Sequence, residues 1–406
     1  MNHFTLSPID HAFLGHGAYP VQFIFYYKEN IDIDALRDSF SSIRHLFWPV
    51  SCGRLERYEG LYLCRKTDQF LSVEETICKQ PLPKFDSPAE LASYAFDIDL
   101  NEALAKFHVF QFEKGSILSV NIAHSIVDGY SFFYLLSMWA KCTKYRKSSI
   151  KKAMTKILGR PSHNRSLLRL ELQSVEVPTE ERALKHWLFD NTGLSLSRKK
   201  EGFTLENSKW STFNVTKDEI KKLVSISFEN PKELGLSWHD LLSALIWQRT
   251  ADKWDSSGDS LTLSSAFDFR RVSLQVNPRY FGNAIRACGV RVSKTEFEKS
   301  SLIDLAQKIR RSTGEVDNAS INRCLECIDS LWRSGGEDFT SRIHVADPDN
   351  GLLVTNLSRL PTRSLDFGTG APEVVVPMTP APRSAVITSI PDGYSVRLSD
   401  PLESPQ

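Results

Sequence analysis

Six consecutive residues in the first half of the chain, His124-Ser125-Ile126-Val127-Asp128-Gly129, combine an imidazole with a carboxylate four positions later. They follow an apolar run that ends at Ile122. Imidazole titrates near neutral pH, so a histidine at a strand end can act as a general base, and the carboxylate can orient it or fix the loop. The same pattern also fits a loop histidine followed by an aspartate that caps the next helix. The motif alone leaves both interpretations open.

Hydrophobic periodicity predicts the elements that must position this motif. Residues 20–27, 107–112 and 117–122 favour strands, and the turn-forming residues 113–116 predict that the last two form a hairpin. Residues 34–47 have the spacing of an amphipathic helix, and the period becomes helical again after Asp128. We therefore expect the histidine at the end of a strand and the aspartate before a helix.

Strands and helices also mix in the second half of the chain. The expected helices are 216–228, 236–252, 302–312 and 321–334, and the expected strands are 261–267, 284–292, 352–355, 385–390 and 394–398. Residues 141–169 are rich in Lys, Arg and Ser, which indicates a crossover or a surface segment. We predict an α/β protein in two halves, residues 1–170 with the His124 motif and residues 171–406 with the segment Asp366–Gly370, each with mixed sheets and helices.

Composition excludes several classes of protein. The 406 residues carry 50 Lys+Arg against 49 Asp+Glu, a net charge of +1, and 41% of them are hydrophobic. These values are typical of a globular chain and give no concentrated basic surface for nucleic acid. No run reaches the roughly 18 apolar residues of a membrane span. We expect neither a nucleic-acid nor a membrane partner.

The seven cysteines are scattered and odd in number, which favours a reducing compartment, and we expect a cytoplasmic protein. Cys324 and Cys327 form a single CxxC inside a stretch with helical spacing. A zinc site needs a second pair at the right distance. We interpret both thiols as structural and predict no metal site.

Several motifs occur in the order seen in one protein family. They are Leu6–Asp10, Leu36–Leu55, His124–Gly129, Ser237–Thr250, Asp268–Arg271, Pro278–Ala284 and Asp366–Gly370. In this order they resemble the BAHD acyltransferases, the CoA-dependent acyltransferases of plants and fungi. The resemblance covers nearly the whole chain. It implies the two-domain chloramphenicol acetyltransferase-like fold, acyl-CoA as co-substrate, a small-molecule acceptor with a hydroxyl or amine, no bound cofactor and a monomer.

The resemblance also implies roles for particular residues. His124 matches the general base. Thr355 matches a donor to the oxyanion of the tetrahedral intermediate, although a threonine at the edge of a sheet explains it equally well. Asp128 is either a relay partner of His124 or, as the resemblance favours, the ion-pair partner of Arg270, with Gly129 supporting the loop.

The remaining matches lie further along the chain. Gly282 and Asn283 match a cofactor-channel wall that contacts CoA, although a tight turn explains them equally well. Asp366 and Gly368 match a structural turn that supports the site.

The chain departs from the family pattern at three positions. Thr369 stands where the family has a tryptophan, and Leu357 replaces an aromatic residue that borders the acceptor, so the acceptor class does not transfer. Ala123 precedes His124, so the double histidine of condensation domains is absent. Two alternatives stay open, namely a condensation-type transferase that takes its acyl group from a carrier protein, and a non-catalytic binding relative.

Overall fold

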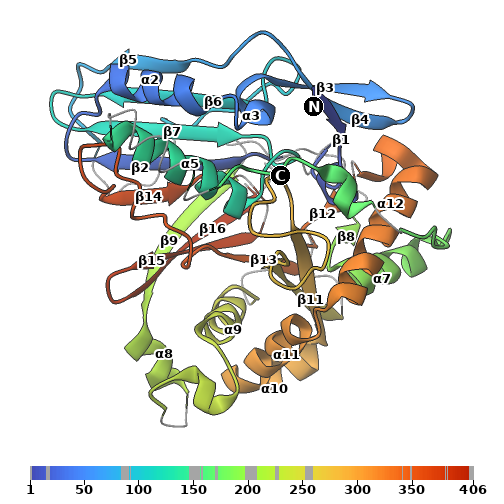
Figure 1. Cartoon of the computed structure of the whole chain (residues 1–406). Coiled ribbons are helices and arrows are strands. Elements are labelled where there is room, and N and C mark those ends of the chain that lie inside the picture. Colours follow the sequence, from blue (N-terminus) through green and yellow to red (C-terminus); the bar gives the residue numbers. More distant parts are fainter. Residues whose placement is uncertain are drawn as a thin grey trace, which may run out of the picture.

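The computed structural model describes residues 2–14, 19–83, 91, 93–145, 156, 159–169, 172–196, 208–224, 228–251, 259–340, 342–347, 350–379, 381 and 383–401. Two main sheets lie one above the other in Figure 1, and further helices lie beneath the lower sheet. The upper sheet is built mainly from the first half of the chain, and the lower sheet comes entirely from the second half.

The first main sheet has five strands in the order β14-β2-β7-β6-β5. Its strands are β2 (Val21–Tyr27), β5 (Val73–Ile77), β6 (Ala105–Gln111), β7 (Ser116–Ile122) and β14 (Val374–Pro377). The predicted hairpin is confirmed, because β6 and β7 pair antiparallel, with Gly115 at a φ of +89° in the turn. Every residue of β2 and β7 is buried, as expected for strands in the interior of a sheet that is covered on both faces.

Helices α2 (Ile33–Ile43) and α5 (Gly129–Lys144) pack together along one face of this sheet (Figure 1). Their apolar residues join β2, β6 and β7 in one core, in which Phe40 and Phe107 both contact Trp139. The Trp139 indole donates to the Leu36 carbonyl at 3.0 Å, which satisfies its polar atom inside the core. The start of α5 is therefore held firmly against the sheet.

A small sheet in the order β1-β4-β3 lies beside the N-terminus. It consists of β1 (His3–Thr5), β3 (Gly53–Tyr58) and β4 (Leu61–Lys66), and the short helices next to it are α1 (Pro8–His11) and α3 (Trp48–Cys52). Helix α1 begins with a capping box, in which the Ser7 side chain accepts from the Asp10 amide and Asp10 accepts from the Ser7 amide. The box fixes the carboxylate of Asp10 at the N-terminus of α1.

The second main sheet has six strands in the order β11-β10-β13-β15-β16-β9. Its strands are β9 (Ser208–Thr216), β10 (Ser260–Asp268), β11 (Ile285–Ser293), β13 (Gly351–Asn356), β15 (Ser384–Ile390) and β16 (Gly393–Pro401). The helices that share its core are α8 (Lys217–Leu223), α9 (Trp238–Ala251), α10 (Lys294–Lys299) and α11 (Leu302–Gly314). Helix α9 is buried on nearly all sides, which explains why its apolar residues are not confined to one stripe.

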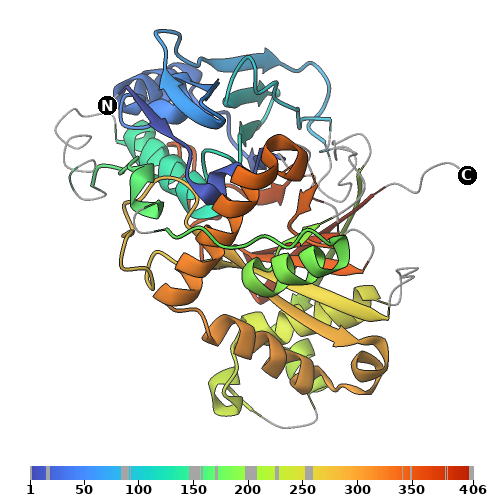
Figure 2. The ribbon, with the colours of Figure 1, turned by 90° about the vertical axis from the view of Figure 1, so that its right-hand side faces the viewer.

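The elements between the sheets join the two halves. They are α7 (Glu181–Thr192), α12 (Asn318–Thr340), the strands β8 (Ser195–Leu196) and β12 (Ile343–His344), and the 3₁₀ turn η1 (Arg165–Leu168). A second 3₁₀ turn, η2 (Pro231–Leu234), connects α8 to α9 and packs against the core of the second main sheet. Helix α12 runs along the side of the molecule (orange in Figure 2) and packs against α1 and α7. Its Trp332 donates to the Gly60 carbonyl in the small sheet at 2.9 Å.

Strand β14 comes from the second half of the chain but pairs with β2 of the first sheet, from Val374↔Tyr26 to Pro377↔Phe23. A single cut near residue 170 therefore does not assign every strand to its sheet. The two-domain boundary stays a prediction, and residues 146–155 of the expected crossover lie outside the described residues.

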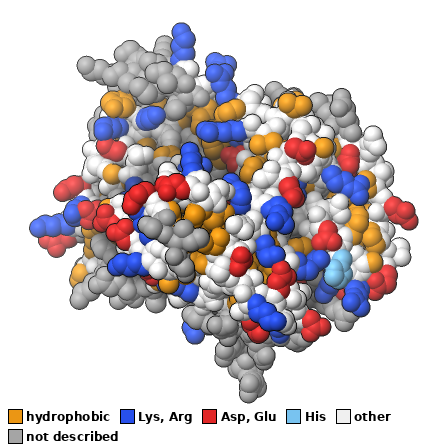
Figure 3. Space-filling model, turned by 90° about the horizontal axis from the view of Figure 1, so that it is seen from below, with side chains coloured by type: hydrophobic (Ala, Val, Ile, Leu, Met, Phe, Trp, Pro, Cys, Tyr) orange, Lys and Arg blue, Asp and Glu red, His pale blue; other side chains and the backbone are white. Residues whose placement is uncertain are grey.

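All seven cysteines are free and buried. Cys324 and Cys327 lie in α12, where burial raises the pKa of their thiols to about 11 and about 12, so both are unreactive. Within the described ranges no helix is long and apolar enough to cross a bilayer, and no group of His, Cys, Asp and Glu could hold a metal ion. Lys, Arg, Asp and Glu are interspersed on the described part of the face in Figure 3.

Candidate active site

The His124 motif forms the connection between β7 and α5. Strand β7 ends two residues before His124, and α5 begins at Gly129. Asp128 is the N-cap residue of α5, and its Oδ1 accepts from the Ser131 amide at 2.8 Å. The histidine therefore lies directly after the strand, and the aspartate caps the helix, as one of the two sequence interpretations predicted.

Asp128 also forms a buried ion pair with Arg270. Arg270 Nη1 lies 2.8 Å from Asp128 Oδ2, and both side chains are at most 1% exposed. The Ala284 amide donates to the same Oδ2 at 3.0 Å, while Arg270 Nη2 donates to Oδ1 at 3.0 Å. The structure thus contains the predicted Asp128–Arg270 pair. Both carboxylate oxygens are bonded away from His124, so this geometry does not form a proton relay.

The surroundings of this pair keep it charged. Burial alone raises the pKa of Asp128, but the charge and hydrogen bonds of Arg270, together with hydrogen bonds from the Ala284 and Ser131 amides, lower it by more, so the net shift is downward. Arg270 is itself fixed by the Tyr280 and Gly282 carbonyls at 3.1 and 2.7 Å. Its guanidinium lies 4.6 Å from the centre of the Tyr130 ring. The pair therefore links the start of α5 rigidly to the segment before β11.

The imidazole of His124 is held by aromatic contacts. Its ring stacks on Phe13, with the centroids 3.8 Å apart, and meets Tyr19 edge-on at 6.3 Å. Its Nδ1 is buried and has no hydrogen-bond partner among the described residues. Burial lowers the pKa of His124, and the negative charge of Asp128 offsets only part of that effect. The ring is therefore neutral at pH 7, which is the form that can accept a proton.

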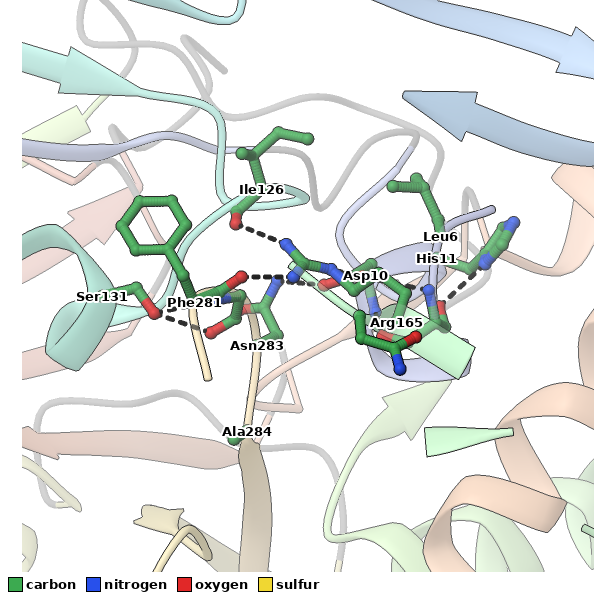
Figure 4. Close-up of polar contacts among 12 residues, drawn as sticks. Leu6, Asp10, His11, Ile126, Ser131, Arg165, Phe281, Asn283 and Ala284 are labelled. Atoms are coloured by element: carbon green, nitrogen blue, oxygen red, sulfur yellow. Dashed lines mark hydrogen bonds and ion pairs between the residues drawn. The ribbon is translucent and has the colours of Figure 1, made fainter. Parts of the chain in front are cut away.

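A second buried ion pair, Asp10 with Arg165, contacts the same loop (Figure 4). Arg165 Nε lies 2.9 Å from Asp10 Oδ2, and both side chains are fully buried. Arg165 Nη2 donates to the Ile126 carbonyl inside the motif at 3.0 Å, and Nη1 donates to the Phe281 carbonyl. The loop is thus held by two arginines, one of which lies in η1.

Asn283 connects this second pair to the histidine. Its Nδ2 donates to Asp10 Oδ1 and to the His124 carbonyl, each at 2.7 Å. Sequence reasoning missed Arg165 and gave Asp10 no role, although Asp10 belongs to the N-terminal family signature. A lone arginine in a basic stretch carries no signal that it will be buried.

His124, Gly129, Thr355 and Leu357 line one narrow cavity of about 90 Å³ between the two sheets. Most other lining residues are apolar, among them Phe13 and Val386. The Thr355 hydroxyl has no hydrogen-bond partner among the described residues. A Cβ added at Gly129 would meet Leu357 at 3.1 Å, so glycine there keeps the cavity open. The structure therefore places the predicted base and the predicted oxyanion donor on one cavity.

The other predicted site residues lie outside this cavity. Gly282 is buried beside Arg165, and a Cβ at that position would overlap the arginine. The Gly282 amide already donates to the Ser131 hydroxyl at 2.9 Å and is therefore not free to bind a ligand. The expected contact of Gly282 and Asn283 with CoA stays a prediction. Asp366 accepts from the Gly368 amide at 2.8 Å and pairs with Lys144 at 2.5 Å, so the predicted turn packs against the end of α5.

The order of strands and helices and the position of the histidine between the sheets define a chloramphenicol acetyltransferase-like acyltransferase fold. The sequence profile of the Transferase family matches residues 2–398, and the chain belongs to this family, which confirms the BAHD resemblance. Shikimate O-hydroxycinnamoyltransferase of Nicotiana tabacum is 23% identical over 301 residues, 72% of this chain and 63% of that protein. The chain spans about 55% to 63% of the length of the curated relatives that it matches.

Solved structures confirm the fold. F. graminearum TRI101, complexed with coenzyme A and T-2 mycotoxin, has a TM-score of 0.71 at 16% identity, covering 98% of this chain and 95% of that one. Vinorine synthase has a TM-score of 0.67 at 17% identity, covering 98% and 90%. At these identities the likeness extends to the fold alone.

Proposed function

We propose that this protein transfers an acyl group from acyl-CoA to a hydroxyl or amine of a small-molecule acceptor, with no bound cofactor. The observation that carries the proposal is the shared cavity, in which a histidine that is neutral at pH 7 and a threonine with an unpartnered hydroxyl lie together. Membership of the Transferase family supports the same chemistry.

The reaction needs two proton transfers, and one imidazole serves both. His124 takes the proton of the acceptor as the acceptor attacks the thioester carbonyl, and Thr355 donates to the oxyanion that forms. When the intermediate collapses, the C–S bond breaks and His124 returns the proton to the CoA thiolate. Asp128, Arg270, Asp10, Arg165 and Asn283 hold the loop and do not exchange protons.

Replacing His124 with alanine tests this proposal. We expect turnover to fall by about 10² to 10⁴, because one side chain carries both proton transfers. Release of free CoA thiol from a panel of acyl-CoAs, with mass spectrometry of products from a cell extract, measures the activity. A folded His124→Ala variant with wild-type rates would show that His124 is not the base.

Thr355→Val tests the oxyanion donor. A bond that strengthens as negative charge develops should lower kcat more than it raises KM, by roughly 10²-fold or more. An effect confined to KM would make Thr355 a substrate-positioning residue.

The donor is tested against the carrier-protein alternative. Ala123 in place of a second histidine supports free acyl-CoA as the donor. Turnover with a carrier-bound acyl group and none with acyl-CoA would contradict our proposal and show that the protein is a condensation-type transferase. Absence of thiol release from every donor would favour the non-catalytic relative.

We also propose that the protein is a cytoplasmic monomer. The seven buried, unpaired thiols support a reducing compartment. Size-exclusion chromatography with light scattering tests the oligomeric state, and a mass of twice 46.0 kDa would contradict it.

A further inference from the structure

Arg397 in β16 is a buried arginine without a carboxylate partner. Only 3% of the residue is exposed. Its Nη2 donates to Met378 Sδ at 3.2 Å, and its guanidinium lies 4.5 Å from the centre of the Trp210 ring. Its Nε has no hydrogen-bond partner among the described residues. No acidic side chain among the described residues forms an ion pair with it, and burial lowers its pKa to about 10.

This arrangement differs from the other buried arginines. Arg165 and Arg270 each bind an aspartate, whereas the described contacts of Arg397 are only sulfur and an aromatic ring. A buried charge without a counter-ion is costly, because desolvation is not repaid by Coulomb attraction. A guanidinium also has a planar fork of N–H donors that matches a carboxylate. The position therefore fits an anion that the described part of the chain does not supply.

Strand register relates Arg397 to the candidate active site. Thr355 pairs with Val386, Val386 pairs with Arg397, and Arg397 pairs with Thr212, so these four residues form one row on one face of the second main sheet. Neighbouring strands lie about 4.8 Å apart, which places Arg397 roughly 10 Å from Thr355 along the sheet. A molecule lying across this face could contact both residues.

A second cavity of about 610 Å³ lies beside Arg397. Its lining is rich in hydroxyl and amide groups and includes Trp210, Thr212, Asn214, Thr362, Thr388 and Ser395. Two of these residues have buried polar atoms, Trp210 Nε1 and Thr362 Oγ1, that find no hydrogen-bond partner in the described part of the chain. Pro377 lines both this cavity and the one at His124, so the two cavities adjoin.

The acidic residue at this cavity does not neutralise Arg397. Glu373 is among the lining residues, but its carboxylate pairs with Lys28. The lining also includes Arg363, which is exposed and donates to the Glu373 carbonyl at 3.4 Å. The charge of the described lining is therefore net positive near Arg397.

We propose that Arg397 binds an anionic group, a carboxylate by preference, carried by a substrate whose reacting atoms lie at His124. The proposal rests on the function proposed above and adds a substrate class, namely elongated molecules with a negative charge about 10 Å from the reacting carbonyl. The carboxylate belongs either to the acceptor or to the acyl chain. In both cases the second cavity holds the far end of the substrate.

The test compares matched acids and neutral analogues by binding, without turnover. The acyl arm uses succinyl-CoA against butyryl-CoA, and the acceptor arm uses 3-(4-hydroxyphenyl)propanoate against its methyl ester. Dissociation constants are measured by calorimetry in the His124→Ala variant and in His124→Ala/Arg397→Met. We expect the acid of one arm to bind roughly tenfold or more tightly than its analogue, and we expect Arg397→Met to abolish that preference.

Equal affinities of acid and analogue in both arms would overturn the proposal, as would a preference that survives Arg397→Met. Because binding is measured without catalysis, activity of His124→Ala would contradict the proposed base without affecting this result. Arg363→Gln removes the same charge from an exposed position on the same cavity. This variant should keep the preference for the acid. Loss of the preference in Arg363→Gln but not in Arg397→Met would show that the anion binds Arg363 instead.

Melting temperature gives an independent readout of Arg397. If the arginine is retained for a ligand, Arg397→Met keeps or raises the melting temperature of the ligand-free protein, because an uncompensated charge leaves the interior. A clear fall in melting temperature, together with unchanged selectivity between acid and analogue, would make Arg397 purely structural.

Discussion

The two ion pairs that hold the His124 loop are alike in burial but differ in what they contact. Asp128–Arg270 joins the cap of α5 to the backbone before β11, and every described bond of its carboxylate avoids the imidazole. Asp10–Arg165 contacts the loop through carbonyl groups and reaches His124 through Asn283.

The difference separates two tasks. The Asp128 pair fixes where the helix starts, since its carboxylate accepts the Ser131 amide. The Asp10 pair fixes the path of the backbone from His124 to Ile126, because Asn283 binds the His124 carbonyl and Arg165 binds that of Ile126. A carboxylate four residues after a histidine can therefore act only in holding the loop in place, without exchanging a proton with the histidine.

The largest effects should come from breaking either pair. Arg270→Ala, Asp10→Asn and Arg165→Ala should each lower the free energy of unfolding by roughly 3–5 kcal/mol, because each leaves a buried charge without its counter-ion. Asp128→Asn should cost less, because Arg270 keeps a second ion pair, with Asp268 at 3.0 Å. Chemical denaturation measures these losses. We expect each double variant within a pair to lose less than the sum of its single losses, with a coupling of about 0.5–3 kcal/mol. Additive losses within a pair would show that its members do not interact.

Acid should destabilise the folded protein, in part through two histidines on the Asp10 side of the site. Burial lowers the pKa of His11, beside Asp10, and of His163, beside Arg165, to about 4. Unfolded histidines bind protons near pH 6.5, so the unfolded state binds more protons than the folded state between pH 6.5 and about 4. Stability should therefore fall as the pH drops through this range, by up to roughly 3 kcal/mol for each histidine.

Denaturation at a series of pH values from 8 to 4 measures this dependence. The double variant His11→Gln/His163→Gln should show a flatter profile. An unchanged profile would assign the acid sensitivity to other groups.

Asn283→Ala should have a smaller effect on stability, about 1–3 kcal/mol, because it leaves Asp10 Oδ1 and the His124 carbonyl short of a donor. If the hydrogen bonds of Asn283 to Asp10 and to the His124 carbonyl position the histidine, kcat should fall while KM changes little. Asn2→Ala is the matched control, since Asn2 is exposed and its change should stay within about 0.5 kcal/mol. Equal kcat values for the two variants would show that Asn283 does not position His124.

Most of the fold was predictable, because its interior strands and helices carry strong periodicity. The strands at residues 20–27 and 117–122 and the helix at 236–252 all occur, as β2, β7 and α9, within one or two residues. The sequence analysis missed β5 and β9, which lie at sheet edges where exposed polar residues break the pattern. The predicted helix 34–47 ends at Ile43, and the helix predicted over 216–228 is shorter, as α8.

The candidate site was predictable only where motifs are local. His124 and Asp128 stand in one hexapeptide, and Arg270 followed from the order of family motifs. Arg165 and Arg397 carried no signal, because a lone arginine on the chain is usually exposed and its burial depends on strands far away in sequence. The hydrogen bond between Asn283 and Asp10 joins residues that are far apart in the sequence. No spacing pattern in a single sequence predicts such a tertiary contact.

The pairing of β14 with β2 has a consequence for biosynthesis. During translation the edge of β2 stays open until residues 374–377 have left the ribosome, since these residues complete the first sheet. An open, apolar strand edge is a template for aggregation. The nascent chain therefore needs protection for most of its synthesis, and expression at lower temperature or with added chaperones should raise the yield of folded protein.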